Sequence, residues 1–294
     1  MATDLQPGVE DQKLAKEIAG LDALEAHLGV RPSRARRIWS TVWPKLAAVI
    51  LALGIWQAVV WSGWREDYVF PGPDRVLPAL FDYMGTGNFW TAVGITMRRA
   101  VTGYLLALVI GSVIGLAVAR VRLLRTAVGS LITGLQTMPS IAWFPLAILL
   151  FGLNEGAIMF VVVLGAAPSI ANGLLAGVDH VPPLMLRAGR MIGAKGIGLY
   201  RHVVLPAALP TYVAGLKQGW AFAWRSLMAG ELLAVVANRP SIGVQLQFAR
   251  DFSQADRMLA IMLVILVIGI VVDTIFGRAD LLIRRRWGLI DHSA

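Results

Sequence analysis

Six long apolar runs constrain the fold of this chain more than any other feature of its sequence. They lie near residues 44–63, 98–119, 126–151, 156–178, 207–235 and 258–282. A helix needs roughly 20 apolar residues to cross the hydrocarbon core of a bilayer, and most of the runs reach that length. Inside a bilayer the backbone must satisfy its own hydrogen bonds, as it does in a helix. The sequence therefore predicts an all-α membrane protein with about six transmembrane helices.

The composition supports this class and excludes others. Charged residues make up 15% of the chain and hydrophobic residues 57%, whereas soluble domains carry roughly 25% charged residues. The net charge of +9 is compatible with nucleic-acid binding, but Lys and Arg gather at the ends of the apolar runs, where topology signals are placed. We therefore expect the lipid bilayer, and no nucleic acid, as a partner. The chain has no cysteine, which excludes disulfides and thiolate chemistry.

The positive charges fall on one side of the predicted helices. That side receives Arg31, Arg34, Arg36, Arg37, Lys45, Arg120, Arg122, Arg125, Arg187, Arg190, Lys195, Arg201, Arg284, Arg285 and Arg286. The other side receives the loop at 64–90, the Asn154-Glu155 turn and the loop at 237–257. Because positively charged loops stay in the cytoplasm, we expect both termini and the loop at 179–206 to be cytoplasmic.

The pattern divides the chain into four regions. They are a cytoplasmic N-terminal extension at 1–40, the first transmembrane helix at 41–64, a main bundle at 65–287 that includes the loop at 179–206, and a cytoplasmic tail at 288–294. The extension is predicted to hold an amphipathic helix, because leucine or isoleucine recurs at helical spacing between residues 14 and 28. That helix either lies on the bilayer surface or docks onto a partner. No short apolar segment follows a basic start, so we expect no cleaved signal peptide.

Proline and glycine positions predict how the helices bend and pack. The third run is interrupted by Met138-Pro139-Ser140 and again by Pro145, so this helix should kink and face protein or a cavity rather than lipid. Small residues four apart occur as Gly111/Gly115, Gly173/Gly177 and Gly215/Gly219. This spacing lets helix backbones approach closely and predicts a compact bundle.

Few ionisable residues lie inside the runs, and the most notable are Lys217, Arg225, Glu231 and Asp273. Such charges are costly at membrane depth, so these either form internal salt bridges and lie near the interface, or line and gate a polar route. The four histidines are too scattered to form a metal cluster. Because no nucleotide-binding glycine loop or Ser-His pair at membrane depth occurs either, we expect no covalent catalysis and no bound metal in this chain.

A basic, glycine-punctuated loop, LRAGRMIGAKGIGLYRHVVLP at 186–206, resembles the signature of importer permeases of the ABC type. That signature is Glu-Ala-Ala, three residues, Gly, nine residues and Ile-x-Leu-Pro. Here the positions are taken by Arg187-Ala188-Gly189, Gly193 and Val203-Val204-Leu205-Pro206, so arginine replaces the acid and glycine the second alanine. The segments MPSIAWFPLAILLFGLNEGA at 138–157, LPAALPTYVAGLKQGWAFAW at 205–224 and Ala229-Gly230-Glu231 resemble the nitrate, sulfonate and taurine branch of these permeases.

The resemblance covers about residues 65–287 and implies a bundle like that of type I ABC importer permeases, with a cytoplasmic coupling-helix loop. In that family the loop folds as two short helices, one of which sits in a groove of an ATPase subunit, and Gly193 permits the bend between them. The implied coupling residues are Arg187, Ala188, Gly189, Gly193, Ala194, Tyr200, Val203, Leu205 and Pro206. Candidates for the translocation path or its gate are Met138, Pro139, Ser140, Trp143, Pro145, Lys217, Trp224, Arg225 and Glu231.

The resemblance also implies partners and a location. We expect a second copy of the permease, two cytoplasmic ABC ATPase subunits that bind ATP and Mg, and an extracytoplasmic solute-binding protein on the loops at 64–90 and 237–257. The location would be a bacterial inner membrane, and the solute a small anion such as nitrate, a sulfonate or taurine, although the branch also carries thiamine precursors and small aromatics. Alternatives are an ion-coupled secondary transporter, with Glu231 and Asp273 as candidate coupling sites, and a membrane enzyme, which the missing catalytic constellation disfavours.

Overall fold

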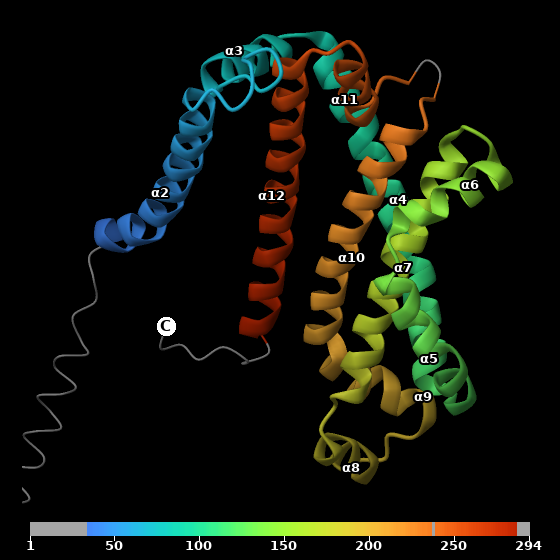
Figure 1. Ribbon diagram of the computed structural model, residues 1–294. Coiled ribbons are helices and arrows are strands. Elements are labelled where there is room, and N and C mark those ends of the chain that lie inside the picture. Colours follow the sequence, from blue (N-terminus) through green and yellow to red (C-terminus); the bar gives the residue numbers. More distant parts are fainter. Residues whose placement is uncertain (1–33, 237–238, 287–294) are drawn as a thin grey trace, which may run out of the picture. The chain divides into compact units, whose positions relative to one another are not determined.

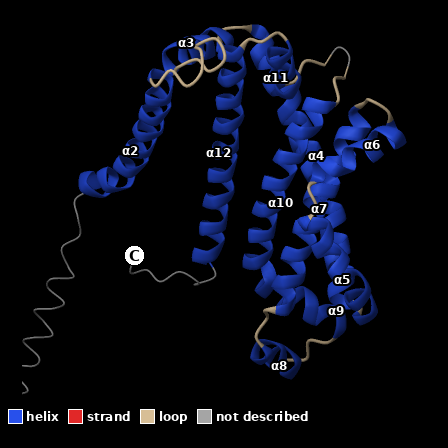
Figure 2. Ribbon diagram, in the orientation of Figure 1, coloured by secondary structure: helices blue, strands red, loops and turns tan. Residues whose placement is uncertain are grey.

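The computed structural model describes residues 34–236 and 239–286, and within these ranges every regular element is helical (Figure 2). The chain divides into two units, Met1–Trp64 and Arg65–Ala294. The amphipathic helix expected between residues 14 and 28 and the expected tail at 288–294 lie outside the described residues.

The first unit contains one described helix, α2 (Arg34–Trp61). Its stretch Val42–Trp61 has a mean hydropathy of 1.6 over 20 residues and is long enough to cross a membrane. Val49, Ile50 and Leu51 are each more than half exposed, as expected of side chains that contact lipid. A helix of sufficient length and hydropathy therefore occupies the position predicted for the first span.

The second unit contains the remaining elements (Figure 1). They are α3 (Pro73–Met84), α4 (Gly87–Arg120), α5 (Arg122–Thr137), the 3₁₀ helix η1 (Ser140–Trp143), α6 (Phe144–Phe151), α7 (Glu155–Asp179), α8 (Pro183–Met191), α9 (Gly196–Leu199), the π-helix η2 (Tyr200–Val204), α10 (Leu205–Leu233), α11 (Ile242–Asp251) and α12 (Ala255–Arg286).

Of the apolar runs, those in α4, α7 and α12 form straight helices long and apolar enough to cross a membrane, as in α2. At 29 residues, α10 is about 43 Å long, which is also enough to cross. Its hydropathy falls below that of the others because it carries Lys217, Gln218 and Arg225 in its middle. This helix is instead extensively buried against its neighbours.

The third run, predicted at 126–151 with an interruption, is broken, because α5 and the η1–α6 segment meet at a bend of 103°. The predicted break at Met138-Pro139-Ser140 is confirmed. Pro145, the second predicted interruption, lies in the first turn of α6, directly after the change from the 3₁₀ helix η1 to an α-helix. There its missing N–H would have had no helical partner in any case.

The helix α7 lies between α4 and α10, and glycines set both contacts. On the α4 side, a Cβ added to Gly111 would lie 2.6 Å from the Ala167 carbonyl oxygen. On the α10 side, a Cβ added to Gly173 would lie 2.5 Å from the Cα of Gly215. These contacts allow almost direct backbone packing. They confirm the compact bundle predicted from the glycine spacing.

Two segments predicted as loops contain helices. Within 64–90 lies α3, and within 237–257 lies α11, whose N-cap Ser241 accepts a hydrogen bond from the Val244 N–H. The helix α4 also starts eleven residues earlier than the predicted 98, because Thr86 caps it by accepting from the Phe89 N–H. Polar caps therefore extend the helices beyond the apolar runs.

Candidate functional site

The loop at 186–206 folds as short helices joined by a glycine turn. Helix α8 ends at Met191 with Ile192 as its C-cap, and the next residue, Gly193, has a φ of +90°, a backbone conformation that favours glycine. The Gly193 N–H donates to the Arg190 carbonyl at 3.1 Å and the Ala194 N–H to the Gly189 carbonyl at 3.0 Å. This pair of bonds is a Schellman motif, which ends a helix by reversing the chain.

Gly189 fixes how α8 packs on the following helix. It is buried, and a Cβ at this position would lie 2.9 Å from side-chain carbons of both Leu199 and Val203. An alanine here would therefore require these two side chains to shift. Gly189, which replaces the second alanine of the family signature, is therefore the position where α8 packs closely on Leu199 and Val203.

The outer face of the loop is apolar and basic. Leu184, Met185, Met191, Ile192 and Ile197 are exposed by 75%, 50%, 88%, 84% and 67%. Arg187, Ala188, Arg190 and Lys195 are exposed beside them, while Ala194 and Val203 are half-buried. Exposed large apolar side chains gathered on one short segment are typical of an interaction surface, and the cations among them favour a partner with acidic groups.

The loop continues into α10 without a break. The residues of η2 lead directly to Leu205 and Pro206 in the first turn of α10, and the junction residues Val204 and Leu205 both have α-helical angles. Tyr200, half-buried, lies 6.0 Å under the guanidinium carbon of Arg120 at the end of α4. Movement of the loop would therefore be transmitted along α10 and to α4.

The path candidates on the broken third span lie at the bend, which includes Met138 and Pro139, and in the η1–α6 segment that follows it. The Ser226 hydroxyl of α10 donates to the Ser140 hydroxyl at 2.7 Å. Both serines pack against Gly165 of α7, because a Cβ added at Gly165 would collide with the Ser226 oxygen. Trp143 is half-buried against the core. Met138, Pro139 and Pro145 are exposed.

Glu231 lies in a buried ion-pair network that includes Arg99, a residue missed in the sequence. Arg99 is 4% exposed and donates from Nη1 to Glu231 Oε1 at 2.9 Å. It also donates from Nε and Nη2 to the Glu155 carboxylate at 2.8 and 2.6 Å. Arg239 lies 3.8 Å from the same Glu155. Glu231 is fully buried, and a buried carboxylate requires a cation beside it. A search for a cation to pair with Glu231 could therefore have identified Arg99 from the sequence.

The same carboxylate holds the start of α11. The Gly243 N–H donates to Glu231 Oε2 at 3.1 Å, the Thr96 hydroxyl to the same oxygen at 2.9 Å, and the Ile242 N–H to the Thr96 oxygen at 3.0 Å. A Cβ at Gly243 would lie 2.4 Å from the Glu231 Cβ. Four helices, α4, α7, α10 and α11, therefore meet at one buried charge cluster.

The other charged candidates on α10 differ from Glu231. Lys217 Nζ lies 3.1 Å from Asp273 Oδ1 of α12, so these two pair internally. Arg225 is exposed, with its guanidinium carbon 5.5 Å from the centre of the Phe222 ring. No acidic side chain between residues 34 and 286, apart from the two undescribed positions 237 and 238, lies within ion-pair distance of it. Arg225 is therefore a cation at membrane depth without a carboxylate partner.

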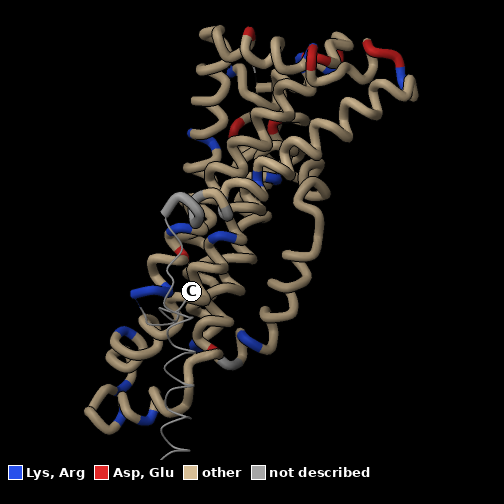
Figure 3. The backbone as a smooth tube through the Cα atoms, turned by 90° about the vertical axis from the view of Figure 1, so that its left-hand side faces the viewer, with Lys and Arg blue, Asp and Glu red and all other residues tan. Residues whose placement is uncertain are grey.

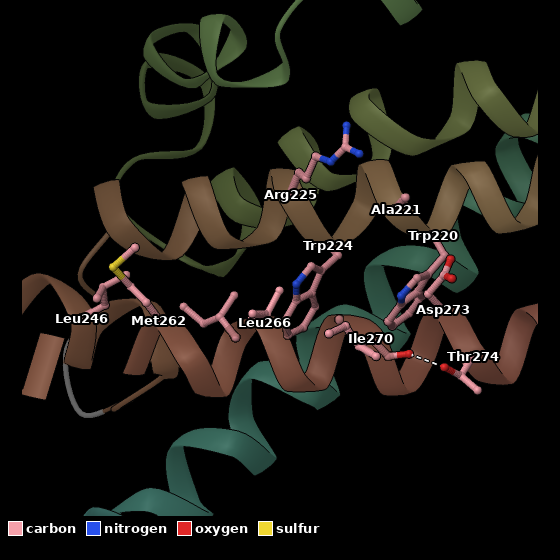
Figure 4. A pocket seen from close by; sticks show the side chains of 12 residues that line it. Trp220, Ala221, Trp224, Arg225, Leu246, Met262, Leu266, Ile270, Asp273 and Thr274 are labelled. Atoms are coloured by element: carbon pink, nitrogen blue, oxygen red, sulfur yellow. Dashed lines mark hydrogen bonds between the residues drawn. The ribbon is translucent and has the colours of Figure 1, made fainter. Parts of the chain in front are cut away.

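A pocket of about 670 Å³ lies between α10 and α12 (Figure 4). It is lined by Trp220, Ala221, Trp224, Arg225, Leu246, Met262, Ile265, Leu266, Gly269, Ile270, Asp273 and Thr274. Trp220 and Trp224 point towards α12, whereas the Arg225 guanidinium extends from the other side of α10. The candidates Trp224 and Arg225 thus both border this pocket, but the Trp224 ring points towards α12 and the Arg225 guanidinium points away from it.

A second pocket, of about 500 Å³, is polar and lies among α5, α7 and α10. It is lined by Gln136, Asn172, Gly173, Leu175, Ala176, Asp179, His180, Thr211, Ala214, Gly215 and Gln218. The Asn172 side-chain amide donates to Gln136 Oε1 at 2.6 Å. The sequence candidates did not include these amides, because Asn and Gln carry no charge and stand out only once the helices are placed.

Comparison with known proteins places the chain in a family. Residues 107–285 match the family described as the binding-protein-dependent transport system inner membrane component. The putative aliphatic sulfonates transport permease and the taurine transport system permease of Escherichia coli are 28% and 27% identical to it, covering 80% and 79% of this chain and 87% of each relative. A solved structure of the inward-facing MetNI methionine ABC transporter shares the fold, with a TM-score of 0.53 and 18% identity over 63% of this chain and 93% of that one. The chain therefore belongs to the binding-protein-dependent inner membrane components, the permease subunits of ABC importers.

Proposed function

We propose that this chain is the permease of an ATP-driven importer that passes a small organic or inorganic anion received from an extracytoplasmic binding protein. The observation that carries the proposal is the loop at 183–204, whose exposed apolar and basic face is continuous with α10. Such a loop supplies a docking surface and a rigid connection to the bundle. ATP and Mg would bind to two cytoplasmic ATPase subunits, and the permease itself would hydrolyse nothing.

The proposed mechanism is a two-state change driven from the partner. Closure of the ATPase pair would displace α8, and the unbroken η2–α10 junction would carry the displacement towards Ser226, which is bonded to Ser140 at the bend. A second permease copy would complete the path. The ligand, ATP, acts by favouring one of two packings of the bundle.

Charge supports an orientation with both termini in the cytoplasm. Within the second unit, acidic residues occur near the end that carries α3 and α11, and basic residues surround α8 at the opposite end (Figure 3). The positive-inside rule then assigns α8 to the cytoplasm. The end with α3 and α11 would receive the binding protein.

Two observations support an anion as the solute. Arg225 is an exposed cation on a central helix with no carboxylate partner among residues 34–236 and 239–286, and relatives are named as permeases for aliphatic sulfonates and taurine. The alternative, an ion-coupled transporter, would use Glu231 or Asp273. Both are paired, with Arg99 and Lys217 respectively, which disfavours it.

Reconstitution tests the proposal. The permease, its ATPase and its binding protein, placed in proteoliposomes, should take up a radiolabelled sulfonate or nitrate only when ATP is enclosed. The matched control is an ATPase variant that binds but does not hydrolyse ATP. Uptake driven by an ion gradient in the absence of the ATPase would refute it.

A further inference from the structure

The exposed side of α10 is unusual for a helix of this length in a membrane protein. Between the end residues Leu205 and Leu233, its exposed positions are Ala214, Gln218 and Arg225. Gln218 and Arg225 are seven residues apart, close to two helical turns, so they lie on one face about 10 Å apart along the axis. None of the three positions carries a large apolar side chain.

The neighbouring helix α4 has the opposite character. Its exposed side chains include Val109, Ile110 and Val113, which are 59%, 42% and 64% exposed. Ile170 of α7 packs against Gly111 of α4 and against Gly219 of α10, so these two glycines lie at the same depth. Val113 and Gln218, which are close to them along the chain, are therefore at a similar depth. An apolar face suits lipid, whereas an amide and a guanidinium at this depth face water or protein.

Two of the three exposed positions of α10, Ala214 and Gln218, line the pocket among α5, α7 and α10, whereas Arg225 borders the pocket between α10 and α12. The primary amides of Gln136, Asn172 and Gln218 and the hydroxyl of Thr211 line it. The close approach of Gly173 and Gly215, which also line the pocket, leaves its wall without side chains at that level. Three helices thus bring neutral hydrogen-bond donors to a space of about 500 Å³.

The charge around this pocket favours an anion. Its one acidic lining residue, Asp179, forms an ion pair with Arg125 of α5. Arg225 has no such partner among the described residues, and it lies on the same face of α10 as Gln218. Arg125, Asp179 and Arg225 together carry a net positive charge, and the neutral amides and hydroxyl of the pocket lie between the ion pair and Arg225.

We propose that this pocket is a transient binding site for a small oxyanion on its way through the permease. The side-chain amides and the Thr211 hydroxyl would donate hydrogen bonds to the oxyanion, and Arg225 would attract it from one side. Neutral donors hold an anion weakly enough to release it, as a transport site must. The inference rests on the proposed function, because it assigns a site to the anion that the permease is proposed to pass.

The absence of cysteine from the chain makes a direct test possible. Gln218→Cys and, as the matched control, Val113→Cys each place one thiol in the subunit within the full reconstituted complex. Both are treated with the anionic, water-soluble reagent sulfonatoethyl methanethiosulfonate, and modification of this subunit is followed by mass. The probes are methanesulfonate and its uncharged analogue methanesulfonamide.

The Gln218→Cys thiol should react with the reagent while the Val113→Cys thiol stays unmodified. Methanesulfonate should slow the reaction at position 218, and methanesulfonamide should not. Adding Arg225→Gln should lower the rate with the anionic reagent by roughly tenfold relative to an uncharged reagent, as expected for loss of a unit charge about 10 Å away at an effective dielectric near 20.

Three results would overturn the site: no reaction at position 218, equal protection by both probes, or no effect of Arg225→Gln. The test is separate from transport. ATP-dependent anion uptake without protection at position 218 refutes the site and leaves the proposed function intact. Protection without ATP-dependent uptake of any oxyanion refutes the proposed function and leaves the site.

Discussion

At the scale of single residues, the buried charge cluster organises one end of the bundle. Arg99 bonds to two carboxylates on two other helices, and Glu231 in turn bonds to a hydroxyl and to a backbone N–H of α11. Such a cluster is costly to bury, and removing one member leaves the others uncompensated. Its contribution is therefore to specify which helices meet there.

Arg99→Met should lower the free energy of unfolding in detergent by about 3–5 kcal/mol, because it leaves Glu231 buried without a cation. The matched control is Arg75→Met, which removes an ion pair whose partners are 56% and 61% exposed. Exposed pairs contribute about 0–1 kcal/mol. Chemical denaturation of the two variants provides the comparison, and equal losses would contradict a structural role for the cluster.

At the scale of elements, the α7–α10 contact depends on Gly173 and Gly215, because glycine has no side chain to keep the two backbones apart. Gly173→Ala should destabilise the protein by about 1–3 kcal/mol, because the added Cβ meets the backbone of Gly215 and overpacks the contact. Gly129→Ala in α5 is the control. Its Cβ would meet nothing within 4 Å, and alanine's higher helix propensity should stabilise by up to about 1 kcal/mol. Thermal unfolding should therefore shift in opposite directions for the two variants.

The loop at 186–206, proposed to dock onto the ATPase, leads to a second prediction at this scale. Gly193→Val should uncouple ATP hydrolysis from transport while the subunit still inserts and assembles, because valine does not readily adopt the φ of +90° that turns α8 back. Gly198→Val is the control, since position 198 has ordinary backbone angles and open space around it. The ratio of solute imported to ATP hydrolysed measures the effect. Unchanged coupling in Gly193→Val would contradict the assignment of the loop.

At the scale of the whole molecule, the positive-inside rule assigns α11 and α8 to opposite sides of the membrane. In cells, Arg250→Cys on α11 should react with a membrane-impermeant thiol reagent added outside, and Arg190→Cys on α8 should react only after permeabilisation. The two arginines are a matched pair, since both are exposed and the chain has no other thiol. The reverse pattern would invert the proposed topology.

Much of the architecture could be read from the sequence, because it depends on local composition. Apolar run length predicted the helices, Pro139 the break, and the glycine spacing the tight contacts. The helices α3 and α11 were missed, since they are short and begin at local signals, Pro73 in α3 and the N-cap Ser241 in α11, rather than at long apolar runs.

The sequence by itself determined that this chain is an all-helical membrane protein with a glycine-turned loop, because bilayer thickness and backbone angles act on neighbouring residues. Only the tertiary structure decided the roles of its polar groups. It brought Arg99 to Glu231, 132 positions away, and paired Lys217 with Asp273, while no carboxylate in the described part of the chain pairs with Arg225. The physical reason is that the free energy of a charge at membrane depth depends on what surrounds it, and those surroundings come from distant helices.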